Sequence, residues 1–156
     1  MVDVIRDAVR KPDVVDVPSK FHTPGDFIPI PEVDALTLVH AIEDGLPVAA
    51  LDRFQERSGL SMQRVTKLVH IPARTLARRR EEGTLTTEES DRLLSVARLA
   101  AAATNLFAGD VAAAMHWLSR PLRALGGTIP LDLAETEAGS QEVHRVILQL
   151  EHGVFP

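Results

Sequence analysis

Residues 61–83 read SMQRVTKLVHIPARTLARRREEG, a pattern that predicts two short helices joined by a tight turn. Ser61 is a suitable N-cap for the first helix, over 62–69, whose apolar residues recur on one side at helical spacing. Residues 70–72 (His-Ile-Pro) interrupt this pattern before a second helix over 73–82, which a glycine follows. Such a pair predicts a helix-turn-helix, even though its turn lacks the glycine that is common in these motifs.

The same segment is the most basic part of an acidic chain. The net charge is -5, yet residues 61–80 contain Lys and Arg and not a single Asp or Glu. The second helix of a helix-turn-helix enters the major groove, where arginine can donate two hydrogen bonds to guanine. We therefore predict base contacts by the start of this helix and phosphate contacts by Arg79 or Arg80. The predicted DNA-binding residues are Arg64, Lys67, Arg74, Thr75, Arg78, Arg79 and Arg80.

A solvated cationic helix face is the alternative interpretation of these residues. Exposed helices usually mix both signs of charge so that residues four positions apart can pair. Here the acids come only at Glu81 and Glu82, at a helix C-terminus that the macrodipole makes unfavourable for them. The unmixed run therefore favours DNA binding.

The rest of the chain also predicts helices, so we expect an all-α protein. Thr86 and Glu89 form a capping box at the start of what should be the longest helix. Alanines in the middle of that helix permit close approach of another helix, in the core or in a dimer contact. Asp110 and Ser140 are expected to cap two later helices, and a proline-started helix is expected over 47–57.

The N-terminal segment, residues 1–32, is predicted to be an extended or partly disordered arm. Its proline density excludes a long helix. It is also acidic, and its apolar residues show little sustained periodicity. The apolar patch at 27–30 could dock onto the body of the protein as an extended segment, or the arm could be a tether without a role of its own. We predict no functional site there.

Composition favours a protein that binds over one that catalyses. The absence of cysteine excludes disulfides, thiolate metal sites and a cysteine nucleophile. The six histidines lack the spacing of a metal-ligand pair, and Ser, Asp and Glu stand in no recognisable catalytic motif. We expect no catalytic residue, no metal and no cofactor. Because the sequence has neither a transmembrane-length apolar run nor a signal-peptide pattern, we expect a cytoplasmic protein.

The C-terminal third carries several linked motifs in a defined order. A-x-x-W-L-x-x-P ends at Pro121, L-G-G-x-x-P-x-x-L spans 125–133, T-x-x-G spans 136–139 and G-V-F spans 153–155. Together they resemble the toxin-binding domain of the Xre/MbcA/ParS family of bacterial antitoxins. The resemblance implies an Xre-like helix-turn-helix DNA-binding domain, which we place at 33–95, followed by a toxin-binding domain at 96–156.

The same resemblance implies a function. Antitoxins of this family belong to type II toxin-antitoxin systems and pair with RES-domain toxins, which consume NAD or use it to ADP-ribosylate proteins. The implied partners are a cognate RES-domain toxin, whose active site the C-terminal domain would occlude, operator DNA and a second copy in a homodimer. The alternative is a helix-turn-helix transcriptional regulator with a partner that is not a toxin.

The final helix and the tail after it are the expected toxin-binding surface. A cleft that binds the diphosphate of NAD should be basic, and this segment is acidic with an apolar end. Phe155 either folds back against the core or is offered to the toxin. The predicted toxin-binding residues are Glu142, Arg145, Gln149, Gly153, Val154, Phe155 and Pro156.

Overall fold

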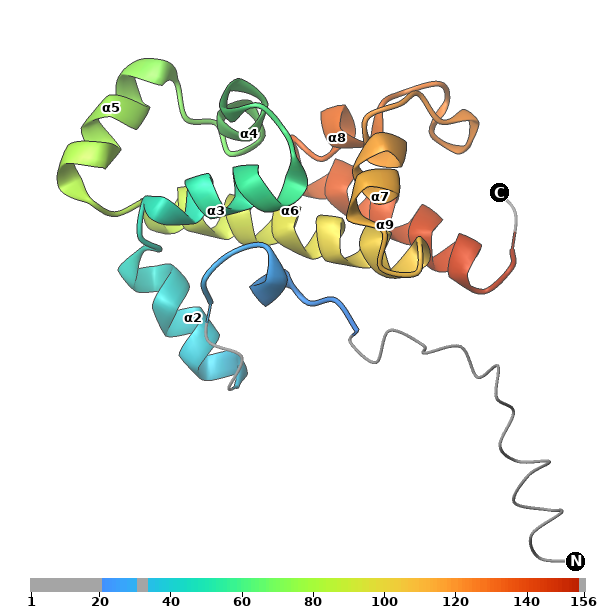
Figure 1. Ribbon diagram of the computed structural model, residues 1–156, viewed down its shortest axis with the longest axis horizontal. Coiled ribbons are helices and arrows are strands. Elements are labelled where there is room, and N and C mark those ends of the chain that lie inside the picture. The colour runs from blue at the N-terminus through green and yellow to red at the C-terminus, as the bar shows by residue number, and fades with distance from the viewer. Residues whose placement is uncertain (1–20, 31–33, 155–156) are drawn as a thin grey trace, which may run out of the picture.

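The computed structural model describes residues 21–30 and 34–154, and it confirms the all-α prediction for them (Figure 1). Within these ranges every regular element is a helix, and extended pairing is limited to two isolated bridges. In chain order the elements are η1 (Pro24–Asp26), α2 (Ala35–Asp44), α3 (Ala49–Ser58), α4 (Met62–Leu68), α5 (Ala73–Glu82), α6 (Thr87–Leu106), α7 (Val111–Leu118), η2 (Arg123–Leu125), α8 (Pro130–Leu133) and α9 (Glu137–Glu151).

Helix α6 is the axis of the fold (Figure 1). It has 20 residues and is the longest helix of the described part, as predicted. Helices α2, α3 and α4, which precede it, and α7 and α9, which follow it, all pack against it. The predicted boundary between residues 95 and 96 therefore falls inside one continuous helix, and the buried apolar residues of both halves form one core.

The alanines of α6 belong to this core. Ala100, Ala101 and Ala103 are at most 3% exposed. Their small side chains let neighbouring helices of the same chain approach closely. These three residues therefore pack within the chain and offer no surface to a second copy.

The described end of the predicted arm is docked onto the body. Phe27 and Ile28 are buried, and the ring of Phe27 lies 6.1 Å from that of Phe54 in α3. The side chain of Asn105 in α6 bonds both the N–H and the C=O of His22, at 2.8 and 2.9 Å. Of the two alternatives for the patch at 27–30, docking is the correct one. The rest of the predicted arm, residues 1–20 and 31–32, lies outside the described residues.

Three of the four predicted caps are confirmed. The side-chain oxygens of Ser61, Thr86 and Asp110 accept hydrogen bonds from backbone N–H groups three residues later, at 2.9 to 3.2 Å. The fourth prediction is wrong, because α9 begins a turn earlier than expected. Thr136 is its cap and bonds the N–H of Gly139 at 3.1 Å, while Ser140 is buried inside the helix.

The T-x-x-G motif has a steric reason. A Cβ atom on Gly139 would lie 1.8 Å from the carbonyl oxygen of Leu133 at the end of α8. Only glycine therefore lets α8 pack this closely against the first turn of α9. The start of α9 is held by a side-chain cap and by backbone contact with α8.

The helix predicted over 47–57 begins later than expected, at Ala49. Pro47 forms an isolated bridge with Thr84, and the N–H of Val48 donates to the carbonyl of Gly83 at 3.0 Å. These long-range bonds tie Pro47 and Val48 to the segment before α6, and Val48, which has helical dihedral angles, is the N-cap residue of α3. A proline start predicted from local pattern alone was two residues early.

Candidate DNA-binding and toxin-binding surfaces

Helices α4 and α5 form the predicted helix-turn-helix. Val65 and Ile71 are buried beneath them, and the N–H of Ile71 donates to the carbonyl of Thr66 at 2.8 Å across the turn. His70 has a φ of 58°, the left-handed conformation that glycine adopts most readily. Histidine is among the residues that tolerate this conformation better than most. His70 thus fills the place where such turns commonly carry glycine.

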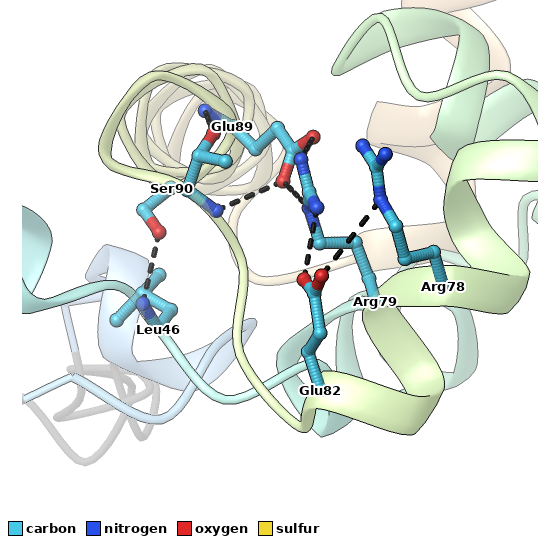
Figure 2. A network of polar contacts seen from close by, with 7 residues as sticks. Leu46, Arg78, Arg79, Glu82, Glu89 and Ser90 are labelled. Carbon is cyan, nitrogen blue, oxygen red and sulfur yellow. Dashed lines mark hydrogen bonds and ion pairs between the residues drawn. The ribbon is translucent and has the colours of Figure 1, made fainter.

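Arg79 of α5 points into the protein, as Figure 2 shows. It is only 9% exposed, and its guanidinium bonds both carboxylate oxygens of Glu89 in α6, at 2.7 and 3.0 Å. A further bond of 2.9 Å reaches Glu82. With these donors engaged below the surface, Arg79 is not placed to meet a phosphate.

The pKa shifts of Arg79 and Glu89 indicate that both side chains are charged. The hydrogen bonds to Glu89 raise the pKa of Arg79 above its ordinary value. Burial alone would raise the pKa of Glu89, but the bonds from Arg79 and from the backbone N–H of Thr86 outweigh it, so its pKa is lowered. Glu89 therefore links α5, which is the second or recognition helix of the helix-turn-helix, to the first turn of α6.

Ser90, the next residue of α6, extends this link. Its hydroxyl accepts a 2.9 Å hydrogen bond from the N–H of Leu46, in the segment between α2 and α3 (Figure 2). The start of α6 thus fastens both the recognition helix and the segment that leads into α3.

The other cations of α5 lie outward. Arg80 makes a two-bond pair with Asp52 of α3, at 2.9 and 3.1 Å, and both side chains are 43% exposed. Arg78 lies 3.8 Å from Glu82, one turn later. Arg74, at the second position of α5, is exposed and has no ion pair among the described residues. Thr75 beside it is half-buried.

The two cations predicted on α4 meet the C-terminal half of the chain. Arg64 pairs with Asp132 of α8 and lies 3.5 Å from Glu135, the second residue after that helix. Lys67 lies 3.3 Å from Glu135 as well. These pairs bring together two predicted DNA-binding residues and two acids of the predicted toxin-binding domain.

The predicted toxin-binding residues lie on α9 and after it. Glu142 and Arg145 form an exposed pair at 2.5 and 3.0 Å, and their mutual hydrogen bonds lower the pKa of Glu142 and raise that of Arg145. Gln149 is half-buried, and its side-chain oxygen is buried without a partner in the described structure.

The end of α9 is closed by backbone hydrogen bonds. The N–H of Gly153 donates to Leu150 at 3.1 Å and that of Val154 to Gln149 at 2.8 Å, with Gly153 at a φ of 69°. This is the Schellman arrangement, which turns the chain away from the helix axis. Val154 is 55% exposed, so it does not close the core. Phe155 and Pro156 lie outside the described residues.

Comparison with known proteins agrees with both halves of the chain. Residues 37–98 match the model of the antitoxin Xre-like helix-turn-helix domain, and residues 102–153 match that of the antitoxin Xre/MbcA/ParS C-terminal toxin-binding domain. An antitoxin Xre of Yersinia enterocolitica is 38% identical over 129 residues, which cover 82% of this chain and 87% of that protein. The chain belongs to the Xre/MbcA/ParS family of antitoxins.

Two further relatives are also antitoxins. An antitoxin Xre of Photorhabdus laumondii is 33% identical, with 72% of this chain and 77% of that protein covered. A Prs ADP-ribosylating antitoxin of a Sphingobium species is 26% identical, with 75% and 79% covered. Family membership indicates that this antitoxin acts by binding a toxin, and its helix-turn-helix suggests DNA binding.

In the described part of the antitoxin no three His, Asp or Glu side chains are grouped as they would be to hold a metal ion. Across the same residues, none of the helices combines the length and the apolar character needed to span a membrane.

The antitoxin also has a groove between α6 and α9 that the sequence analysis missed. Arg98, His144 and Leu148 line it, with the Ser95 and Ser140 hydroxyls 3.2 Å apart at its floor. Burial lowers the pKa of His144, an effect to which Arg98 adds and which Glu137 opposes. Leu148 is 54% exposed. Its apolar side chain, off the buried stripe of α9, was the one sequence signal for this surface.

Proposed function

We propose that this antitoxin acts in the cytoplasm, represses its own operon through α5 and neutralises a RES-domain toxin through its C-terminal segment. The position of Arg74 carries the DNA half of the proposal. A long cation at the start of a recognition helix, exposed and unpaired within the described structure, is suited to reach guanine in the major groove.

The remaining DNA contacts follow from exposure. Thr75 and Arg78 lie next to Arg74 along the helix and complete the set proposed for base edges. Arg80 is proposed for a phosphate, because an exposed pair such as that with Asp52 contributes at most about 1 kcal/mol and can be exchanged. Arg79 is left out. A homodimer would present two copies of α5 to half-sites about 34 to 36 Å apart.

Binding to DNA from the antitoxin's own promoter tests this half. Arg74→Ala should cost about 1 to 3 kcal/mol and relax sequence preference, whereas Arg80→Ala should weaken binding to all sequences alike and flatten the salt dependence. Arg145→Ala on α9 is the control and should change neither. Unchanged promoter binding after joint replacement of Arg74 and Arg78 would contradict the assignment of α5.

The toxin half rests on charge and on the exposed end of α9. The segment 121–156 has more acids than cations, which suits a basic cleft that binds NAD. Val154 is exposed at its end and Phe155 follows, so two apolar side chains are candidates for the few anchors that dominate an interface. Glu142, Arg145 and Gln149 would contact the rim, and Gly153 would aim the tail. The name of the Sphingobium relative, an ADP-ribosylating antitoxin, is consistent with a RES-domain partner.

Deletion of residues 153–156 tests this half. The shortened antitoxin should fold, because only a terminus beyond α9 is lost, yet it should fail to protect cells from the RES-domain toxin and fail to inhibit NAD consumption. An Arg74→Ala, Arg78→Ala variant is the matched control and should neutralise fully. Inhibition by the shortened protein at equal concentration would show that another surface neutralises, and the groove between α6 and α9 is then the next candidate.

A further inference from the structure

Four charged side chains join the helix-turn-helix to the toxin-binding half of the chain. Arg64 and Lys67 come from α4, Asp132 from α8 and Glu135 from the turn after it. Arg64 contacts both acids, and Glu135 contacts both cations. The cluster is electrically neutral, so the first helix of the helix-turn-helix presents no net positive charge in this conformation.

The location of the cluster makes this neutralisation relevant to DNA. In a helix-turn-helix the first helix lies across the DNA backbone while the second enters the groove. Helices α5, α4 and α8 follow one another along the upper edge of the molecule in Figure 1. Duplex DNA that approaches α5 would therefore meet α4 next, with the acids of α8 beside it.

The exposure of the four side chains indicates that the ion pairs within the cluster can be exchanged for contacts with another partner. The Lys67 side chain is 61% exposed and that of Asp132 43%, whereas Arg64 and Glu135 are 23% and 27% exposed. Partly exposed pairs of this kind contribute little to stability because water screens them. A phosphate oxygen is an equally good acceptor for both cations.

We propose that α4 is a phosphate-binding surface that Asp132 and Glu135 occupy in the free antitoxin, so that these acids hold down its affinity for duplex DNA. The inference rests on the proposed function, because it assumes that α5 faces the duplex. It makes an unusual prediction: removing two acids from the toxin-binding half strengthens DNA binding.

The experiment compares Asp132→Asn, Glu135→Gln in the full chain with the natural protein. Two duplexes serve as probes, one from the antitoxin's own promoter and one of scrambled sequence. The double variant should bind both about 3- to 10-fold more tightly at low salt, with a salt slope steeper by about one to two. Because the expected change is a gain, misfolding cannot imitate it.

Two controls test whether the gain comes from the release of Arg64 and Lys67. Glu142→Gln, Glu151→Gln removes two exposed acids from α9, the same change in net charge, and should change the affinity less than twofold, which excludes an effect of net charge. Arg64→Gln, Lys67→Gln, added to the Asp132→Asn, Glu135→Gln variant, should return the affinity to about that of the natural protein, because the cluster is again neutral. A fourfold variant that keeps the higher affinity would show that the gain does not come from these cations, and would overturn the proposal.

The remaining outcomes are also decisive. Equal affinities for the Asp132→Asn, Glu135→Gln variant and the Glu142→Gln, Glu151→Gln control would overturn the inference even where the natural protein prefers its promoter duplex. Failure of the proposed DNA function would appear differently, as equal binding of the promoter and scrambled duplexes by the natural protein.

Discussion

The recognition helix α5 and the C-terminal helix α9 are fastened to the protein by different chemistry. Arg79 holds α5 through ionised side chains, with three hydrogen bonds to Glu89 and Glu82 (Figure 2). The first turn of α9 is held by backbone contact at Gly139 and by the Thr136 cap. A buried ion pair demands one angular position of the arginine, whereas close backbone packing demands only the absence of a side chain. Different substitutions should therefore disrupt the two surfaces.

The largest effect is expected from Glu89→Ala. This change leaves the buried guanidinium of Arg79 without its main acceptor and also removes half of the capping box, so the free energy of unfolding should fall by about 3 to 5 kcal/mol. Urea denaturation measures the loss. Asp52→Ala is the matched control, since it removes the partner of the exposed Arg80 and should cost at most about 1 kcal/mol. Equal losses in the two variants would mean that α5 is not held by its buried pair.

A smaller effect is expected from Gly139→Ala. The new methyl group would meet the Leu133 carbonyl, so α8 and α9 must move apart at a cost of about 1 to 3 kcal/mol. Toxin neutralisation should weaken while promoter binding persists. Gln141→Ala, at an exposed position of the same helix, should stay within about 0.5 kcal/mol. A Gly139→Ala protein as stable as this control would refute the close-packing argument.

The smallest effect on stability is expected in the turn before α5. His70→Gly relieves a left-handed backbone at the expense of a more flexible unfolded chain, and the balance should raise the free energy of unfolding by about 0.5 kcal/mol. His116→Gly, in the last turn of α7, should instead lower it by up to about 1 kcal/mol. Thermal unfolding of both variants checks the two opposite signs. A loss at His70 would mean that its side chain contributes more than its backbone strain costs.

Much of this architecture could be predicted because its signals are local. A cap such as Ser61 acts on an N–H three residues away, and the helical period of the apolar residues needs only one or two turns of chain. The same locality explains the error at Ser140. Both Thr136 and Ser140 are acceptable caps, and the packing of α8 on Gly139, invisible in the local pattern, decided for the earlier one.

The amino-acid sequence by itself therefore determined the helices, the helix-turn-helix and the family motifs of the C-terminal half. It also placed a run of cations between residues 61 and 80. The partner of most of these cations depends on the tertiary structure, because that partner is distant in the chain. Arg79 meets an acid 10 residues away, Arg80 one 28 away and Arg64 acids 68 and 71 away. Charge in a sequence records which residues can pair, whereas folding decides which carboxylate lies within reach of each cation and leaves Arg74 exposed without one.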